Sequence, residues 1–557
     1  MTQPTPVRSQ AGIKRDGTRF DGQFYTDGQW VRFQRGLPRK MGGYRSINSD
    51  INGIVRQFHT EAQNGVVYTH VGHSDGVQRF TIDTSGNTSA PSDRTPLTFT
   101  PNDNFMWQFD AMFDGAGGGA VVIAHAAETA LDISSGVNYP VYIGDIYGTG
   151  ALTEIPTDGV CGGIVVLHPY LFMFSKTGFV KWSDINDPTN FTSGDAGSAN
   201  VTSAKIVRGI ALRGGGQSPS GLLWSLDSLI RASYTGGTDV FRFDTISSSI
   251  SVLASNGIIE YDGVYYWCGL DRFMYYNGVV QDLPNTLNTN FFFDNMNYAN
   301  ANKVFAFKVP RFGEIWWCFP KGESTECNHA VIYNVRENTW YDTALPEGGR
   351  SAGIYAQVFR SPLLAGIQQV ELATGEIRVV EPDESLIVDF ISGEYFSREL
   401  FVDEVDKTRK TEDDNERITD TGLISYKIWR HETGVDVIDG STVNAIRSYF
   451  ETGPISLLTG QTPALRALSI SAIEPDFVQS GDMIVQVGGY INAKANTVLS
   501  SPKQFPAVPS TPDEEVVKFK ELRRIMTLRF ESNTVGGDYQ MGNTIAHIQP
   551  ADGRYQS

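Results

Sequence analysis

Two pairs of acidic residues lie close enough in the sequence to suggest acid–base chemistry. Asp184 and Asp187 share the run DINDP, and Asp413 and Asp414 are adjacent. Glycoside hydrolases need only two carboxylates a few ångströms apart, so such pairs are candidates. However, an Asp-Asn-Asp-Pro run is typical of an Asx turn, and Asp413-Asp414 belongs to a solvated charge cluster. We therefore interpret both pairs as structural.

Metal and nucleotide chemistry also find little support. His70 and His73, followed by Asp75, form the closest histidine pair, but a zinc site needs a further ligand at a defined place. The glycine-rich stretches 115–119 and 214–216 lack the Lys-Ser/Thr that would reach phosphates, and we interpret them as loops. No H-E-x-x-H motif occurs. The sequence predicts a non-enzymatic protein with no cofactor and no metal.

The four cysteines, Cys161, Cys268, Cys318 and Cys327, form no C-x-x-C pair. They are too few for a disulfide framework in 557 residues, so we expect free thiols. Cys268 and Cys318 lie in apolar aromatic runs, where cysteine acts as a small hydrophobic residue.

The elements that would position these residues are predicted to be strands. Short runs of aromatic and β-branched residues recur about every 42 to 58 residues, which is close to the length of a four-stranded propeller blade. The runs are 66–68, 121–123, 164–167, 222–224, 264–267 and 315–317. The spacing predicts an all-β fold, a β-propeller of six or seven blades, against the alternative of unrelated sandwich hairpins.

One stretch contains a whole predicted blade. Asp262-Gly263 and Asn277-Gly278 are hairpin signals, and they divide residues 256–280 into four strands. A closed ring also needs its ends joined. We expect the N-terminal strand Trp30–Phe33 to pair with a late blade.

The composition suggests four regions along the chain. Residues 1–50 form a basic N-terminal segment with the ring-closing strand, and 51–400 form the propeller. Residues 401–445 read as a charged insertion or linker, and 446–557 as a C-terminal β-sandwich-like domain in which apolar residues line one face.

Charge is distributed unevenly. The whole chain carries −18, which disfavours tight wrapping of nucleic acid. Residues 1–45 instead hold nine Lys or Arg against three Asp, a net charge of +6. This segment reads either as a solvated face or as a docking surface for an acidic neighbour. The N-terminus has no apolar run, and no stretch approaches about 18 apolar residues, so we expect a soluble protein made in a cytoplasm without membrane insertion.

Six short structural motifs, spread over nearly the whole chain, carry a family resemblance. They are 25–33, 36–44, 181–191, 429–436, 448–452 and 528–533. They resemble segments of tail hub or nozzle proteins of short-tailed phages, the family that includes packaged-DNA-stabilisation proteins.

The resemblance implies a propeller with a C-terminal β domain, assembled as a homo-oligomeric, hexameric ring in the virion tail. It implies a position below the portal and head-to-tail adaptor, contact with tail fibres or a tail-tip protein, and transient, non-sequence-specific DNA passage during ejection. It transfers no catalytic residues. An acidic duct would let DNA slide. Arg32, Arg35, Arg39 and Lys40 then become the predicted subunit or adaptor interface.

Two other functions remain open at this stage. A propeller that binds or cleaves host-surface glycans would use aromatic-rich loops and carboxylates such as Asp184 or Asp187. A bacterial surface adhesin is disfavoured because no signal sequence is seen.

Overall fold

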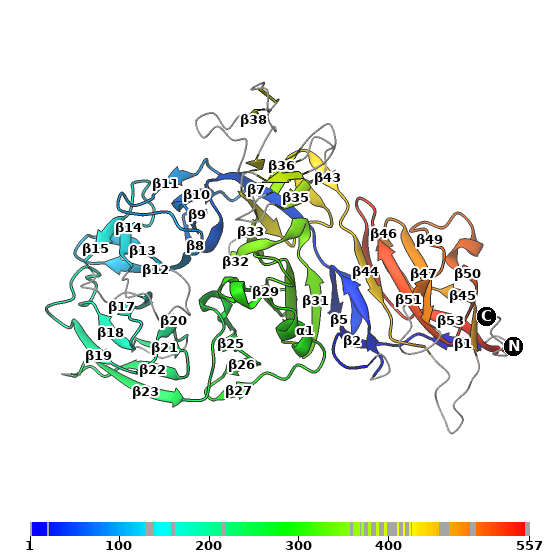
Figure 1. The fold of residues 1–557 in the computed structure, drawn as a ribbon, viewed down its shortest axis with the longest axis horizontal. Coiled ribbons are helices and arrows are strands. Elements are labelled where there is room, and N and C mark those ends of the chain that lie inside the picture. The colour runs from blue at the N-terminus through cyan, green and yellow to red at the C-terminus, as the bar shows by residue number, and fades with distance from the viewer. Residues whose placement is uncertain are drawn as a thin grey trace.

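The computed structural model places strands in almost every described part of the chain. It describes residues 3–18, 22–127, 139–156, 162–213, 219–237, 239–356, 360–367, 426–455, 467–490 and 497–551, with short strand pieces between 369 and 424. The fold is all-β: a β-propeller joined to a second, β-sandwich-like domain (Figure 1).

Within the described residues, six blades are consecutive antiparallel four-stranded sheets. The first three are β8 (Val55–Gln63), β9 (Val66–His73), β10 (Gly76–Ile82), β11 (Ser92–Asp93); β12 (Met106–Asp114), β13 (Gly119–Ala127), β14 (Val141–Asp145), β15 (Thr153–Ile155); and β16 (Gly163–Leu167), β17 (Tyr170–Phe174), β18 (Phe179–Trp182), β19 (Gly197–Asn200). The next three are β20 (Ile206–Ala211), β21 (Ser220–Ser225), β22 (Leu229–Tyr234), β23 (Phe241–Ser247); β24 (Ile259–Tyr261), β25 (Val264–Cys268), β26 (Phe273–Tyr276), β27 (Val280–Asp282); and β28 (Phe305–Val309), β29 (Glu314–Phe319), β30 (His329–Asn334), β31 (Thr339–Ala344).

The fifth of these blades is the predicted 256–280 unit. Asp262 and Gly263 have φ values of 50° and 80°, the positive pair that a tight hairpin requires. The adjacent strands β24 and β25 pair in register from Tyr261↔Val264 outward. The local hairpin chemistry thus specified this blade correctly.

A seventh sheet completes the ring in the described part of the chain. It joins β32 (Arg350–Ala356), β33 (Ser361–Gly366), β41 (Tyr426–His431) and β7 (Tyr44–Ile51), and continues into β42 (Val437–Asp439) and β43 (Thr442–Asn444). The first strands β32 and β8 lie side by side, which closes the circle (Figure 1). The ring is therefore closed by a strand from the N-terminal region.

The prediction that Trp30–Phe33 closes the ring was wrong. Its residues enter β5 (Val31–Gln34), which pairs with β6 (Leu37–Lys40) in the second domain. Closure falls instead to β7, which pairs antiparallel with β41, although β41 lies inside the range expected to be a linker. The reason is local pairing: β5 forms a hairpin with β6 through Arg35 and Gly36, both with positive φ, and β6 pairs with β52 of the second domain.

Segments from both ends of the chain build the second domain. Its sheets contain β1 (Gln3–Pro6), β53 (Ile545–Ala551), β45 (Ala467–Glu474) and β50 (Val517–Arg523); β4 (Asp27–Gln29), β44 (Ser448–Glu451), β51 (Ile525–Ser532), β47 (Met483–Tyr490), β48 (Val498–Leu499) and β49 (Lys503–Phe505); and β46 (Phe477–Ser480), β52 (Asp538–Met541), β6 and β5. A parallel pair, β2 (Gln10–Ile13) and β3 (Phe24–Tyr25), lies beside them. The domain thus includes residues 3–40 as well as the C-terminal strands.

Smaller elements complete the described structure. The helix α1 (Thr289–Asp294) and the 3₁₀ turns η1 (Ser255–Gly257), η2 (Tyr298–Lys303), η3 (Pro346–Gly348) and η5 (Pro512–Glu515) are short. Between β33 and β41 lie β34 (Gln369–Glu371), β35 (Ile377–Val379), β36 (Leu386–Val388), β37 (Tyr395–Ser397), β38 (Arg409–Lys410), β39 (Glu416–Arg417) and β40 (Leu423–Ile424). Among the described residues, no helix has the length and hydropathy to cross a membrane.

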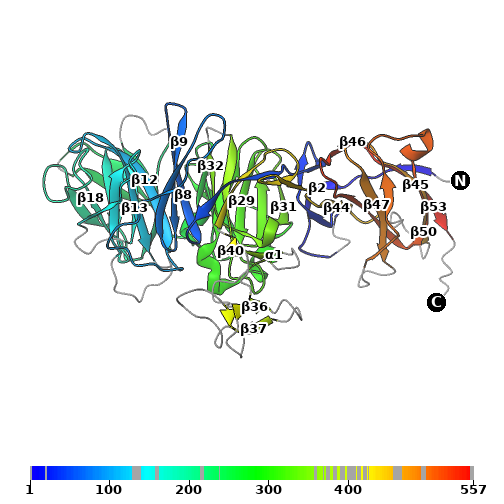
Figure 2. The same ribbon diagram turned by 90° about the horizontal axis from the view of Figure 1, so that it is seen from above.

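The hydrophobic core continues from the propeller into the second domain. One buried cluster contains Phe307 and Trp316 of the sixth blade together with Phe450, Leu528 and other residues of the second domain. Figure 2 shows the two domains side by side, with the N-terminal strands between them. Because burying apolar surface is the main stabilising term, this shared core holds the domains together.

Candidate functional site

The four basic residues predicted as an interface lie near the junction of the two domains, and two of them are buried. Arg32 is 1% exposed and Lys40 is 2% exposed. The ammonium of Lys40 donates to the carbonyl of Gly537 at 2.6 Å. Arg35 is exposed and Arg39 is half-buried. The prediction of a surface role is therefore wrong for Arg32 and Lys40, because contacts inside the chain occupy their cationic groups.

Arg32 is the centre of a buried ion cluster. Its guanidinium lies 2.8 Å from a carboxylate oxygen of Glu314 and 2.5 Å from one of Glu432, and it covers the ring of Phe312 at 3.7 Å. Glu314 also accepts hydrogen bonds from Trp316 at 2.9 Å and Tyr341 at 2.7 Å. Burial raises the pKa of Glu314, although Arg32 opposes the shift. Since β5 carries Arg32 and β29 carries Glu314, the cluster joins the two domains.

A second ion cluster fixes the N-terminal segment to the sixth blade. Arg15 lies 2.7 Å from Asp27 and 2.9 Å from Asp342, and His329 lies 3.0 Å from Asp342. Burial alone would raise the pKa of Asp342, but Arg15 and His329 outweigh it and lower the pKa to about 2. The carboxylate of Asp16 accepts backbone N–H groups at the start of α1. These contacts hold the segment against the ring.

Aromatic residues from distant segments also meet at the junction. Trp30 lies 5.9 Å from Tyr44 by ring centroids, and Tyr44 stacks on His431 at 5.0 Å. Phe450 stacks on Phe530 at 5.3 Å in the adjoining sheet. The segments 25–33, 36–44, 429–436, 448–452 and 528–533 therefore pack around one structural junction.

The carboxylates of the DINDP run are held in a turn of the third blade. Asp184 accepts backbone N–H bonds from Ile185 and Asp195, both at 2.8 Å. Asp187 accepts one from Thr189 at 3.1 Å. These contacts confirm the interpretation of the run as a turn. Asp413 and Asp414 lie outside the described residues.

The two histidines considered as metal ligands have other partners. His70 lies 2.7 Å from the guanidinium of Arg94, and Nδ1 of His73 accepts from the backbone of Asp75 at 3.2 Å. Within the described ranges, no group of three or more His, Cys, Asp or Glu residues could hold a metal ion. Residues 115–118 form the loop between β12 and β13, as expected, while Gly119 is the first residue of β13, and 214–216 lies outside the described residues.

Cys268, Cys318 and Cys327 are free and buried. Cys161 lies outside the described residues. Burial raises the pKa of all three described thiols, which makes them poor nucleophiles.

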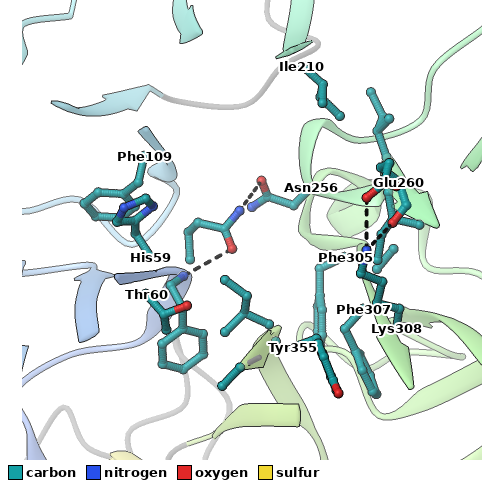
Figure 3. A pocket seen from close by; sticks show the side chains of 18 of the residues that line it. His59, Thr60, Phe109, Ile210, Asn256, Glu260, Phe305, Phe307, Lys308 and Tyr355 are labelled. Carbon is teal, nitrogen blue, oxygen red and sulfur yellow. Dashed lines mark hydrogen bonds and ion pairs between the residues drawn. The ribbon is translucent and has the colours of Figure 1, made fainter. Parts of the chain in front are cut away.

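The most site-like feature of the propeller is a cavity at the centre of its ring, with a volume of about 560 Å³. Its walls come from the first strand, or the turn before it, in blades 1, 2, 4, 5, 6 and 7 (Figure 3). These first strands run in the same direction because each blade repeats one up-and-down order. Their C-terminal ends therefore meet at one side of the ring.

Charged residues lie near that side. Lys308 donates to the carboxylate of Glu260 at 3.0 Å and to its carbonyl at 2.7 Å, and Arg213 lies 3.4 Å from the same carboxylate (Figure 3). The backbone of Gly263 donates to Glu260 at 2.8 Å. Burial alone would raise the pKa of Glu260, but Gly263, Lys308 and Arg213 together lower it. Glu260 is therefore an ionised, hydrogen-bonded group rather than a proton donor.

A side-chain bridge crosses the ring at the other end of the cavity. The amide of Asn256 donates to the carbonyl of Arg56 at 3.1 Å, and Gln57 donates to the amide oxygen of Asn256 at 3.4 Å (Figure 3). These bonds link the first and fifth blades. The bridge crosses the channel at this end of the cavity and obstructs it.

Sequence reasoning did not find this cavity. Each blade contributes only a few residues, such as His59, Phe109 and Asn256, from strands about fifty residues or more apart. No local motif marks them. The strand β8, which contributes His59 and Thr60, is polar along most of its length and carries no pattern that marks a cavity wall.

Comparisons with known proteins give little further information. Neither a family model nor a curated protein matches the sequence. Among solved structures, Sqt1 of Saccharomyces cerevisiae is 11% identical over 70% of this chain and 99% of its own, with a TM-score of 0.37. An exo-β-1,3-galactanase from Phanerochaete chrysosporium, with galactose, is 9% identical over 91% of this chain and 100% of its own, with a TM-score of 0.24. These scores are too low to support an argument, so the fold is assigned from the sheets of this structure alone.

Proposed function

We propose that this chain is a structural subunit of a short phage tail, a hub or nozzle component that forms a homohexameric ring below the portal and adaptor. The observation that carries the proposal is the convergence of five of the six family-like segments on the domain junction, the sixth, 181–191, lying in the third blade. Residues such as Trp30, Arg32 and Glu432 lie in those segments and lock the two domains together. An ion-paired and aromatic junction between two domains suits a structural subunit that must keep its shape in an assembly.

The charge and the shape of the chain support the same role. With a net charge of −18, a ring of such subunits would repel phosphates, so DNA would slide through its lumen instead of binding tightly. The bridge at Asn256 obstructs the propeller channel itself. The proposed DNA path therefore runs through the lumen between subunits.

Electron microscopy of the purified protein and of the virion tests this proposal. We expect rings, with this chain located in the tail below the portal and adaptor. A strictly monomeric protein that is absent from virions would refute the tail role.

The remaining part of the predicted basic interface is Arg35 with Arg39. Arg35→Glu combined with Arg39→Glu should weaken ring assembly, measured by light scattering coupled to gel filtration. Lys520→Glu, a charge reversal at an exposed position of the second domain, is the matched control. Rings that form equally well in both variants would rule out this interface.

The alternative function, glycan binding or cleavage by the propeller, is favoured by one observation, the central cavity with its aromatic and polar walls. Asp184 and Asp187 are poor candidates for its chemistry because their carboxylates bind the backbone of their own turn. A binding role at the cavity needs no such pair.

A further inference from the structure

We propose that the central cavity of the propeller binds a neutral sugar residue. The proposal rests on the glycan alternative for its ligand class and places it at a site other than Asp184 and Asp187. It does not depend on the tail role. It is carried by the size of the cavity, its balance of charge, its aromatic walls and its unpaired polar atoms.

The size of the cavity suits a small ligand. A volume of about 560 Å³ lies within the roughly 300–1,000 Å³ of typical ligand pockets. The bridge between Gln57 and Asn256 gives the pocket an end wall, so a ligand would enter from the side of Glu260 and Lys308. A terminal residue of a glycan chain meets this requirement, because the rest of the chain can extend outward.

The charges around the cavity nearly balance. Lys308 and Arg213 are balanced by Glu260 and Glu61, which also lines the wall. Arg208 also lines the cavity and leaves the lining with one positive charge in excess, which the nearby carboxylate of Asp110 opposes. Burial lowers the pKa of His59 to about 4, so this ring is uncharged at neutral pH. A wall with mixed charges that nearly balance gives little attraction for anions or cations over neutral molecules.

Aromatic side chains from four blades line the cavity, but Phe305 and Phe307 are only 3% and 2% exposed, so His59 and Tyr355 offer most of the accessible ring surface. His59 stacks with Phe109 at a centroid distance of 6.4 Å, and Phe305 stacks with Phe307 at the same distance (Figure 3). Tyr355 of the seventh blade also lines the wall, and this blade lies between the sixth and the first in the ring. A pyranose ring has an apolar C–H face that such rings can cover, since removing apolar surface from water is favourable.

Polar atoms in the wall lack partners. Nε2 of His59 and Nη1 of Arg208 are buried with no hydrogen-bond partner in the described part of the chain. Buried polar atoms of this kind call for an explanation, such as a ligand. The guanidinium of Arg208 can only donate a hydrogen bond, whereas a nitrogen of the neutral imidazole of His59 donates or accepts according to its tautomer. A sugar hydroxyl can both donate and accept, so it can pair with either group. The hydroxyl of Thr60, also on the wall, adds another group that can donate or accept a hydrogen bond.

The experiment measures binding of monosaccharides and short oligosaccharides to the full-length protein by ligand-observed NMR, followed by calorimetry on the best ligand. Inorganic phosphate, spermidine and adenosine are the comparison probes. We expect at least one sugar to bind and each comparison probe to bind more weakly. No sugar binding at 10 mM, about the weakest useful affinity, or tighter binding of a comparison probe, would overturn the inference.

Two variants of cavity residues test whether the sugar binds in the cavity. Glu260→Gln and Thr60→Val should each weaken the affinity about tenfold, the loss expected for one hydrogen bond. Asp282→Asn, the same kind of change on an outer strand of the fifth blade, should leave the affinity unchanged. Sugar binding that survives both cavity variants unaltered would show that the cavity is not the site. Ring assembly is scored separately, so failure of the sugar inference and failure of the tail role are distinguishable.

Discussion

Arg32→Met tests whether the buried ion cluster holds the two domains together. The substitution keeps an unbranched side chain over Phe312 but removes the guanidinium. Glu314 is 0% exposed and would be left without its cation, and Glu432, at 11% side-chain exposure, would lose its partner too. Removing one partner of a buried ion pair costs about 3–5 kcal/mol, because an uncompensated charge remains in the interior.

The structure places the expected loss at the lower end of that range. Glu314 keeps its hydrogen bonds from Trp316 and Tyr341, and Glu432 has some access to water. We therefore expect a loss of about 3 kcal/mol in the free energy of unfolding, roughly a hundredfold in the folded-to-unfolded ratio. The measurement is urea denaturation followed by tryptophan fluorescence, with Trp30 and Trp316 close to the cluster.

The loss should depend on pH in a defined direction. The folded-state pKa of Glu314 is already raised by burial, and removing Arg32 raises it further. A carboxyl with a raised folded-state pKa takes up a proton on folding, so its penalty disappears as the pH falls through that pKa. The stability difference between wild type and Arg32→Met should therefore be larger at pH 8 than at pH 5.

Arg311→Met is the matched control for this prediction. Arg311 is exposed and approaches the same Phe312 ring at 5.2 Å, so Arg311→Met should change stability by no more than about 0.5 kcal/mol. If Arg32→Met costs less than about 1 kcal/mol, which falls below the expected range, or if its cost does not fall toward pH 5, the cluster is not what couples the domains.

Three further predictions follow from the described contacts. Asp342→Asn should remove stability that wild type has above about pH 4 and loses as the pH falls toward 2, because Arg15 stabilises only the charged carboxylate; acid unfolding monitored by circular dichroism measures this, and identical acid curves would contradict it. Gly72→Ala should destabilise the protein by about 1–3 kcal/mol in thermal unfolding, since its new methyl would lie 2.3 Å from Trp107; an unchanged melting temperature would argue against this packing. Cys268 should resist alkylation in the native protein and react after denaturation, as followed by peptide mass spectrometry; fast native labelling would contradict its burial.

Local chemistry made the consecutive blades predictable. Pairs such as Asp262-Gly263 fix a hairpin within a few residues, and each such blade is built from neighbouring strands. The strand pairing of the seventh blade was not predicted, because β7 and β41 are separated by most of the chain. A pattern of alternating side chains indicates that a strand exists and not which strand it pairs with.

The residues of the junction and the cavity were harder to predict for a related reason. A basic residue is expected at the surface, yet Arg32 is buried because Glu314 and Glu432 reach it from 282 and 400 residues away. The cavity likewise gathers single residues from several blades. In both cases the environment is created by tertiary packing, which a linear sequence does not display.

Closure of the ring by β7 also sets an order of events in synthesis. The strand Tyr44–Ile51 leaves the ribosome early, but its partner β41 ends at His431. At about 5–20 residues per second, the partner follows on the order of tens of seconds later. Throughout that interval β7 is an unpaired strand edge, and the six consecutive blades form an open arc. Closure of the ring therefore cannot precede synthesis of β41, and a nascent chain stopped before residue 426 would present that edge to other molecules.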